Sequence, residues 1–498
     1  MLNKQSTHRW IMVGVLLLLW GLLLIRFDES FYGKGEEAFA WISASVRAFK
    51  EFGPPTMDFL PIYTMGLTDP ESATYYLNHP PTMIWLIAMG AELFGYDPVL
   101  GGPHVSSIRM VGLIATMLTL PLFYVMARQL VSPNKALLAF IFYAFAPVTL
   151  YFGRMPYYDM LIMPVILAFA YVFIQWMHHY NKKLIWMMIL LGSIAMWIDW
   201  TGAFYFAVFG LIALIYGKRE HRIGISIAGI IIGLATLAII VFYVIVNEDT
   251  VTRLQDALFT RIVSENVTLS EQLMWDRFIL RYIGHMLQML AISTTFFGFI
   301  GLIIVSLRKK DFNTIMLLSW FIAPFIFMMI ARNPWHFHDW YKLHFLPGFA
   351  IFASITVIKL WQLKPEGIQR YAKPLVVALI ICTFGANVYI LYSLNQTLFP
   401  FAPALATELP QHTEADDTIG TNFDIRLLPV EYYAYRNISW GVMPETLEAF
   451  YQNAEAVDLQ YLMCEPFVDR GIFTSYDYIL LESIDCRLYH IVKPDTSD

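Results

Sequence analysis

The sequence predicts an all-α polytopic membrane protein with about eleven transmembrane helices, followed by a small α/β domain. Hydrophobic residues make up 58% of the 498 residues and charged residues only 14%, whereas a soluble domain carries about 25% charged residues. Eleven apolar runs lie along the chain, and most reach the roughly 17–25 residues that cross the hydrocarbon of a bilayer. Such a chain keeps its apolar surface from water only where lipid is the solvent.

The first apolar run follows Lys4 and Arg9, as the core of a signal peptide would. No small-residue cleavage site follows it, so we expect an uncleaved first span. Asp199 and Trp200 separate two shorter runs, which we expect to form a tight helical hairpin. The expected helices cover residues 10–26, 105–127, 136–152, 160–178, 184–198, 202–217, 223–246, 286–307, 314–331, 343–361 and 374–394.

The loops between these runs alternate between basic and cation-poor, which predicts their orientation because basic loops stay in the cytoplasm. The basic loops hold Arg128 and Lys135; Lys182 and Lys183; Lys218, Arg219 and Arg222; Arg308, Lys309 and Lys310; and Lys359, Lys364, Arg370 and Lys373. We therefore expect an inner- or plasma-membrane protein with a cytoplasmic N-terminus. Eleven crossings would place the C-terminal segment outside.

Three of the expected outside segments are long. The first, residues 27–104, has apolar residues at helical spacing at Phe39, Ile42 and Val46 and again over residues 82–94. These spacings predict helices that lie in the interface plane. Together with the spans they would form a transmembrane domain of residues 1–394. The second long segment is residues 247–285.

The third outside segment, residues 395–498, is long enough for a small α/β domain of its own. We expect strands at Tyr476–Leu481 and Arg487–Val492 and a helix near residues 445–457. Cys464 and Cys486 lie in this segment, either as a disulfide or as two free thiols. The net charge is −6 and there is no basic tract, which excludes nucleic acid as an expected partner.

Ionisable residues gather at the outer edge of the expected bundle, although they come from separate parts of the chain. Ionisable groups at membrane depth are costly, so they mark functional sites more often than surface charges do. We therefore expect a site at this edge. Its candidate residues are Asp28, Glu29, His79, Arg154, Asp159, Asp199, His336, His338, Asp339 and Lys342.

Each candidate has a structural and a functional interpretation. Asp28 and Glu29 either end the first helix as interfacial charges or supply a general base and an acceptor-orienting carboxylate. His79, before two prolines, either starts a helix or lines the site. Arg154 either binds a lipid phosphate or snorkels from a helix end and pairs with Asp159.

The segment Trp335–Lys342 mixes histidine, aspartate and aromatic residues. Trp340 and Tyr341 fit the membrane interface. The pattern His336-x-His338-Asp339 resembles a divalent metal site, but spacing fixes no further ligand, so contact with a phosphate or sugar is favoured over a metal.

Three of these motifs together resemble a known family. Phe27-Asp28-Glu29-x-x-Tyr32-Gly33, His79-Pro80-Pro81 and Arg154-x-x-x-x-Asp159 are similar, in order and in expected topology, to motifs of protein O-mannosyltransferases. The layout also resembles the lipid A aminoarabinose transferase and other GT-C glycosyltransferases. The resemblance implies that Asp28 is the catalytic base, Glu29 its acceptor-side neighbour and Arg154 the ligand of the donor phosphate.

The sequence also departs from the mannosyltransferase pattern. Thr82-Met83-Ile84-Trp85 follows the prolines, where those enzymes have Leu and then Lys, and the second long loop has no β-trefoil insertion. These departures leave the sugar and the acceptor open. Glu36 and Glu37 are close enough to Asp28 in the chain to compete for the role of the base.

The expected function is the inverting transfer of a sugar from a polyprenyl-phosphate donor to an acceptor hydroxyl on the extracytoplasmic side. A phosphate is already a good leaving group, so we expect neither a metal nor another cofactor. The expected partners are membrane lipids, the lipid-linked sugar and an acceptor that the sequence does not identify.

Two alternatives stay open at this stage. A polymerase or ligase using pyrophosphate-linked donors would need a second outside cation, which Lys342 or Arg332 could supply. A transporter or flippase is less favoured because such proteins carry repeats and broken helices at the bilayer midplane, whereas the charges here are expected at the outer edge.

Overall fold

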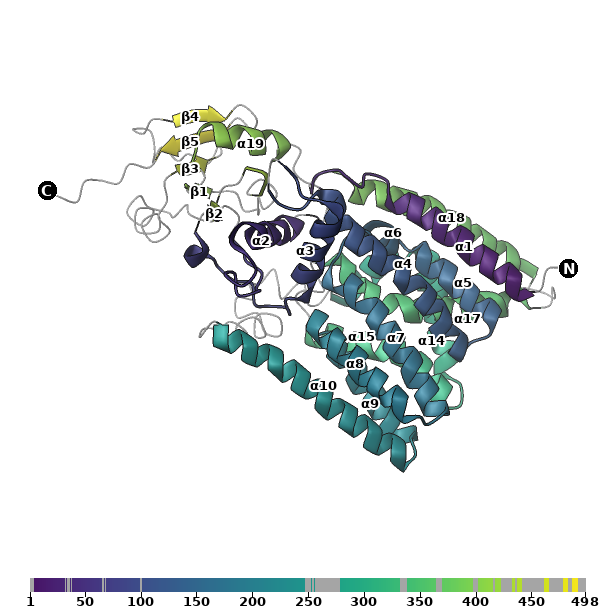
Figure 1. Cartoon of the computed structure of the whole chain (residues 1–498). Coiled ribbons are helices and arrows are strands. Elements are labelled where there is room, and N and C mark those ends of the chain that lie inside the picture. The colour runs from purple at the N-terminus through teal and green to yellow at the C-terminus, as the bar shows by residue number, and fades with distance from the viewer. Residues whose placement is uncertain are drawn as a thin grey trace. The chain divides into compact units, whose positions relative to one another are not determined.

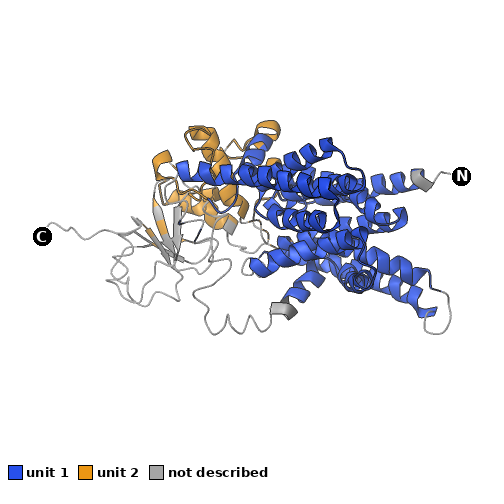
Figure 2. Ribbon diagram, turned by 90° about the horizontal axis from the view of Figure 1, so that it is seen from below, with its two compact units in different colours: residues 1–27, 77–90, 108–394 blue, residues 28–76, 91–107, 395–498 orange. Residues whose placement is uncertain are grey.

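The computed structural model describes residues 4–246 apart from 32, 34–35, 37, 65–66, 68 and 99–100, and then residues 252, 255, 278–331, 338–363, 370–396 and 402–414. Beyond these it describes residues 417–421, 432–434, 437–440, 461–464, 478–481 and 486–490. The chain forms two compact units (Figure 2). Unit 1 contains residues 1–27, 77–90 and 108–394, and unit 2 contains residues 28–76, 91–107 and 395–498.

Unit 1 is a bundle of helices (Figure 1). Two of them, α3 (Thr82–Phe94) and α4 (Val105–Leu130), each have a few residues in unit 2. The others are α1 (Lys4–Leu23), α5 (Pro133–Ala144), α6 (Pro147–Phe152), α7 (Tyr158–His178), α8 (Lys182–Ile198), α9 (Gly202–Tyr216), α10 (Arg219–Val246), α13 (Phe278–Met289), α14 (Ile292–Ser306), α15 (Phe312–Ile330), the 3₁₀ helix η2 (Asp339–Phe345), α17 (Leu346–Trp361) and α18 (Ala372–Leu394).

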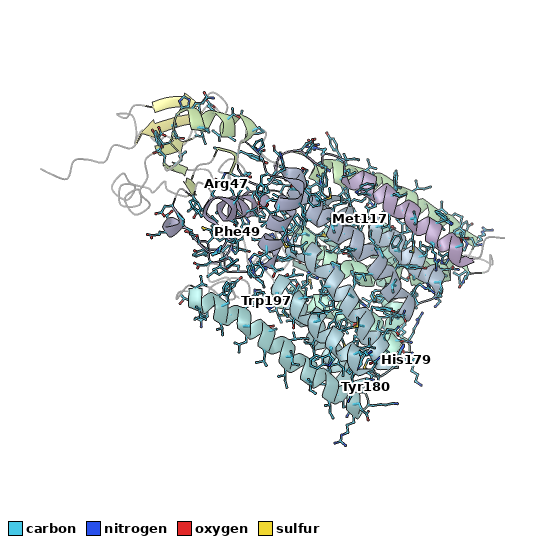
Figure 3. The ribbon with its side chains drawn as sticks, in the orientation of Figure 1. Arg47, Phe49, Met117, His179, Tyr180 and Trp197 are labelled. Atoms are coloured by element: carbon cyan, nitrogen blue, oxygen red, sulfur yellow. The ribbon has the colours of Figure 1, made fainter. Side chains whose placement is uncertain are left out.

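Apolar helices long enough to cross a membrane make this a multi-span membrane protein. Among the described residues seven helices are long and apolar enough, and a bent pair raises the number to eight. Helix α10 carries apolar side chains along its open face (Figure 3), including Ile230 at 64% and Ile245 at 79% exposure. Lipid is the solvent in which such a face is stable.

The expected number of eleven spans is not confirmed, for identifiable reasons. The run 136–152 is broken at Pro147, which begins the short helix α6. The hairpin at Asp199 is present as expected, but α8 and α9 have only 17 and 15 residues. The run 286–307 is divided by a bend of 116° between α13 and α14, where Ala291 has φ +72°.

Polar side chains satisfy the backbone at this bend. The Thr295 hydroxyl donates to the carbonyl of Met286 at 2.9 Å. The amide of Ser293 donates to the hydroxyl of Thr383 on α18 at 3.0 Å. Four residues further along α18, the Asn387 amide donates to the carbonyl of Phe145 at 3.1 Å. An open amide or carbonyl in lipid costs several kcal/mol, roughly, so the contacts of Thr295 and Ser293 stabilise the bend, and that of Asn387 satisfies the break between α5 and α6.

Unit 2 combines parts of the first long loop with the C-terminal segment. Its helical elements are α2 (Ala38–Phe52), η1 (Pro70–Ser72), α19 (Ala402–Glu408) and η4 (Leu409–Gln411). Its strands are β1 (Thr418–Thr421), β2 (Asn437–Trp440), β3 (Tyr461–Cys464), β4 (Tyr478–Leu481) and β5 (Cys486–His490).

These strands form a mixed sheet in the order β2-β1-β3-β5-β4. Strand β1 pairs in parallel with β2 and β3, whereas β5 pairs antiparallel with β3 and β4. The two predicted strands correspond to β4 and β5. The helix predicted near residues 445–457 lies outside the described residues. A separate domain of residues 395–498 stays a prediction, as does the state of Cys464 and Cys486.

The two helices predicted in the first loop are present as α2 and α3. The expected apolar face of α2, with Phe39, Ile42 and Val46, is buried. However, every residue of α2 from Phe39 to Phe49 is buried, including Arg47. Burial of α2 therefore extends beyond the expected apolar face over this stretch.

Helices α14 and α17 approach each other closely at Gly301. A Cβ atom at this position would lie 2.1 Å from the carbonyl oxygen of Phe352 and 2.8 Å from its Cα. Backbone cannot move aside as a flexible side chain can, so only glycine permits this contact.

Gly301→Ala should therefore destabilise the bundle by about 1–3 kcal/mol, the usual cost of overpacking. Gly229→Ala on α10 is the matched control, because nothing lies within 4 Å of its Cβ position. Thermal unfolding of both variants in detergent micelles checks the difference. Equal midpoints would contradict the close packing of α14 on α17.

Candidate functional site

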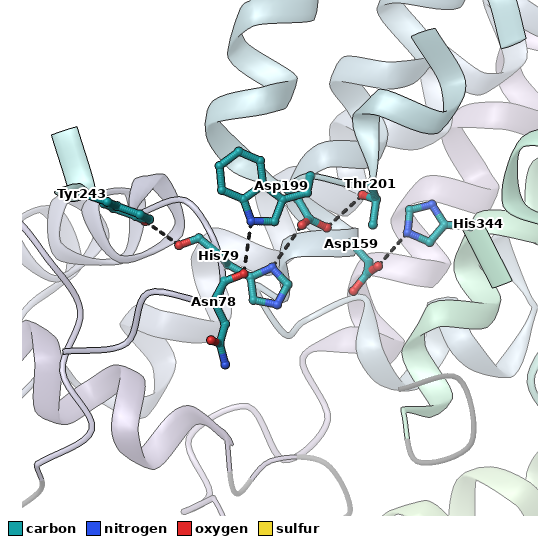
Figure 4. Close-up of polar contacts among 8 residues, drawn as sticks. Asn78, His79, Asp159, Asp199, Thr201, Tyr243 and His344 are labelled. Atoms are coloured by element: carbon teal, nitrogen blue, oxygen red, sulfur yellow. Dashed lines mark hydrogen bonds and ion pairs between the residues drawn. The ribbon is translucent and has the colours of Figure 1, made fainter. Parts of the chain in front are cut away.

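The first element of the candidate site is a buried pair of His79 and Asp199 (Figure 4). Pro80 and Pro81 end the extended segment before α3 and place His79 ahead of that helix. Its Nδ1 lies 3.0 Å from Oδ1 of Asp199, which caps the C-terminus of α8. The other carboxylate oxygen accepts the hydroxyl of Thr201 at 2.8 Å. The carboxylate is therefore hydrogen-bonded through both oxygens.

The backbone beside His79 is held by side chains from two other helical segments. The hydroxyl of Tyr243 on α10 donates to the carbonyl of His79 at 2.5 Å. The indole of Trp200, in the α8–α9 turn, donates to the carbonyl of Asn78 at 3.1 Å (Figure 4). The imidazole of His79 stacks on the ring of Tyr158 with centroids 4.2 Å apart. Together these contacts fix both the position and the plane of the imidazole.

The second element is a buried pair of Asp159 and His344. Oδ1 of Asp159, in the first turn of α7, lies 2.6 Å from Nε2 of His344 in η2. The Tyr205 hydroxyl on α9 lies 3.1 Å from the other ring nitrogen of His344 and 3.2 Å from its carbonyl oxygen. Both nitrogens of His344 are thus engaged, one with a carboxylate and one with a phenol.

The two pairs share α7, because Tyr158, which stacks on His79, directly precedes Asp159. The N-terminus of α7 carries positive dipole charge, which favours a carboxylate there. A carboxylate taken from water costs several kcal/mol, roughly, unless it is paired and hydrogen-bonded. Both acids meet that requirement. The name His–Asp cluster is used below for four residues: His79, Asp159, Asp199 and His344.

Two buried arginines bind the chain where it leaves α1. Arg154 donates to the carbonyl of Ile25. Arg109 donates from one nitrogen to the carbonyls of Arg26 and Phe27, each at 2.9 Å. Arg26 has φ +57°, a left-handed conformation that costs free energy in a non-glycine residue. The guanidinium groups therefore hold the backbone of residues 25–27 in a turn that it would not keep alone.

A further set of charges lies in η2. Asp339 is buried, and its Oδ1 is 2.9 Å from Nδ1 of His285 on α13 and 3.8 Å from Nζ of Lys342. Lys342 is fully buried and also donates to the carbonyl of His338 at 3.0 Å. His338 stacks on Trp340 with centroids 4.5 Å apart. The cation expected at Lys342 is therefore held next to a carboxylate.

The predicted site residues fall into separate groups. His79, Asp159 and Asp199 meet in the His–Asp cluster of unit 1, and His338, Asp339, Tyr341 and Lys342 lie together in and beside η2. Asp28 and Glu29 are exposed in the turn after α1 and belong to unit 2. Glu36 is buried and accepts the amide of Gly33 at 3.0 Å. Glu37 and His336 lie outside the described residues.

Four polar residues escaped the sequence interpretation: Arg109, Tyr205 and His344, which are buried, and His285, which is half-buried. All four lie inside or beside the expected apolar runs, where the hydropathy of the run conceals them. An arginine at the start of a span is itself a signal of function, so Arg109 could have been found. In the described part of the chain no three His, Cys, Asp or Glu side chains are grouped as metal ligands.

Comparison with known proteins relates this geometry to a fold and to a family. Residues 78–246 match the profile of the family described as dolichyl-phosphate-mannose-protein mannosyltransferase. The match includes His79, Arg109, Arg154, Asp159 and Asp199. The predicted resemblance is confirmed. A comparison with curated protein sequences finds no match.

Solved structures share the fold over nearly the whole chain. The crystal structure of ArnT from Cupriavidus metallidurans bound to undecaprenyl phosphate is 13% identical, with a TM-score of 0.65 over 97% of this chain and 98% of that one. The archaeal oligosaccharyltransferase AglB from Archaeoglobus fulgidus, in complex with an inhibitory peptide and a dolichol-phosphate, is 12% identical, with a TM-score of 0.62 over 93% and 70%. The mycobacterial arabinofuranosyltransferase AftD is 12% identical, with a TM-score of 0.52 over 98% and 40%. The chain thus has the GT-C fold.

The pairing of Asp159 with His344 is testable by a double-mutant cycle. His344→Leu leaves a buried carboxylate without its imidazole, which should cost about 3–5 kcal/mol. Asp159→Leu removes the charge itself. The double variant should be less destabilised than the sum of the single variants by about 1–3 kcal/mol.

Unfolding in mixed micelles with increasing SDS provides the measurement. Combining His344→Leu with Thr236→Val is the control, since in the described part of the chain the Thr236 hydroxyl donates to the carbonyl of Ile232 in its own helix. That control pair should be additive. Additivity for Asp159 and His344 would refute an energetic coupling between them.

Proposed function

We propose that this protein is an integral membrane glycosyltransferase that moves a sugar from a polyprenyl-phosphate donor to an acceptor hydroxyl. One observation carries the proposal. The buried His79, Asp159 and Asp199 all lie within the segment that matches the mannosyltransferase family, in a chain that shares its fold with a protein solved with undecaprenyl phosphate. The shared fold and these buried polar groups support the proposal.

The donor phosphate is proposed to bind Arg154, with His79, Asp159, His338 and Lys342 lining the donor site. An arginine carries five N–H donors, and the bond to the carbonyl of Ile25 uses one of its nitrogens. In transfer, the lipid phosphate gains negative charge as it leaves, and a positioned arginine stabilises that charge.

Asp28 is proposed as the general base and Glu29 as its acceptor-side neighbour. Asp28 is exposed to solvent, as a group that meets an acceptor from water must be. Chain connectivity keeps its Cα within about 11 Å of the Cα of Ile25, whose carbonyl Arg154 binds. Asp28 follows Ile25 by three residues in the chain.

The proposed step is one displacement. The acceptor oxygen forms a bond to the anomeric carbon as the bond from that carbon to the phosphate oxygen breaks. The acceptor proton goes to Asp28, and the electron pair of the broken bond stays on the lipid phosphate. A single displacement inverts the anomeric configuration. We propose that it occurs on the extracytoplasmic face of an inner or plasma membrane, with the N-terminus in the cytoplasm.

The remaining candidates have supporting roles in this proposal. Asp199 orients His79, and Asp339 holds Lys342. Tyr341 contributes aromatic surface beside His338. His336 is also proposed for the donor site, and Glu36 and Glu37 are kept as less certain candidates; Glu37 and His336 lie outside the described residues.

Asp28→Asn should lower the turnover number by about 100-fold or more, because an amide cannot accept the acceptor proton. The assay uses purified protein in lipid nanodiscs with radiolabelled mannose, arabinose or aminoarabinose on polyprenyl monophosphate. Glu71→Gln, the same chemical change at an exposed acid of the first loop, is the control. Normal turnover in Asp28→Asn would reject Asp28 as the base.

We also propose that transfer needs no divalent metal, because phosphate leaves without Lewis-acid help and Arg154 can stabilise its charge. Incubation with excess EDTA followed by exchange into metal-free buffer should leave the turnover number within about twofold of the untreated enzyme. Loss of turnover that added Mg²⁺ or Mn²⁺ restores would overturn this part of the proposal.

A further inference from the structure

The C-terminal segment contributes one short turn to the interior of unit 2. Tyr432, Tyr433 and Ala434 form this turn, and Tyr432 and Ala434 are buried. Burial raises the pKa of the Tyr432 phenol above its ordinary value. The turn, named the tyrosine turn here, meets three parts of the first long loop.

The first contact is with Phe31, three residues after Asp28 in the chain. The amide of Phe31 donates to the hydroxyl of Tyr433 at 3.1 Å. The two rings are stacked with centroids 6.4 Å apart, and Phe31 packs in turn on Phe39 of α2 at 5.8 Å. Phe31 is almost completely buried, with 1% exposure. Its position is therefore set from the C-terminal segment and from α2 together.

The second and third contacts are made by Tyr432. The guanidinium of Arg47 on α2 lies 5.2 Å from the centroid of its ring, a separation typical of a cation–π interaction. A Cβ at Gly102 would lie 2.3 Å from the Tyr432 hydroxyl oxygen. The backbone at residue 102 can approach the phenol this closely only because it is glycine.

We propose that the tyrosine turn positions the loop that carries Asp28 and Glu29, so that the C-terminal segment is a working part of the transfer site. The inference rests on the proposed function. Phe31 is the nearest fully buried residue after Asp28, and Tyr433 binds both its amide and its ring. Asp28 and Glu29 are exposed, so Phe31 is the anchor that limits their motion on the C-terminal side. Tyr433 is a positioning residue, which need not touch the substrate.

Tyr433→Phe removes the hydroxyl that accepts the Phe31 amide and keeps the stacked ring. We expect faster hydrogen–deuterium exchange at residues 29–33 in the full-length protein in nanodiscs. We also expect a turnover number about three- to tenfold lower, the size of effect produced by one lost hydrogen bond. The KM for the lipid donor should stay within about twofold, because Tyr433 does not bind the donor. Tyr433→Ala should lower the turnover number further.

Tyr461→Phe in strand β3 is the matched control, since it removes a hydroxyl from the same C-terminal segment. It should leave exchange at residues 29–33 and turnover unchanged. Exchange at the wild-type rate in Tyr433→Phe would overturn the proposal. Faster exchange with an unchanged turnover number would also overturn it. So would a higher KM without a lower turnover number.

Asp28→Asn, measured in parallel, separates this inference from the proposed function. An inactive Asp28→Asn beside a fully active Tyr433→Phe refutes the positioning role alone. An active Asp28→Asn refutes the base assignment, and the exchange measurement still decides whether Tyr433 holds the loop.

Discussion

The structure depends on pairing buried charge inside an apolar bundle. Lipid offers no hydrogen bonds, so each acid buried there needs a partner within the protein. Asp199 is bonded by an imidazole and a hydroxyl, and Asp159 is bonded by His344. These contacts join the segment before α3 to the α8–α9 turn, and α7 to η2. The same pairs that make the acids tolerable therefore also fix how these four parts of unit 1 meet.

Much of the fold was predictable, because its main signal is local. Each expected apolar run contains helix, and the break at Asp199 follows from two residues that do not suit the interior of a span. The number of spans was not predictable in the same way. Ala291 gives no sequence signal for a bend of 116°, since the left-handed conformation there is imposed by contacts with other helices. The burial of the polar side of α2 likewise depends on distant segments.

The candidate site was predictable as a set of residues but not as a set of partners. His79 and Asp199 were both recognised, yet they are 120 positions apart, and no periodicity links them. Asp159 and its partner His344 are 185 positions apart, and His344 lies at the start of an apolar run. Arg154 was recognised as a cation for phosphate, whereas its bond to the carbonyl of Ile25 is visible only in three dimensions. The sequence therefore identified the kinds of residue in the site, whereas only the three-dimensional structure shows which residues pair.

Helix α18 shows what an apolar solvent does to helix association. Most of its surface is open, and only Val376, Thr383, Asn387 and Leu394 are buried. Thr383 and Asn387 lie one turn apart and bond to α14 and to the segment before α6. Apolar side chains gain little by leaving lipid for protein, so these two directional polar bonds contribute to where α18 packs. A helix with different aliphatic residues could pack at the same place, provided that it kept a threonine and an asparagine four residues apart.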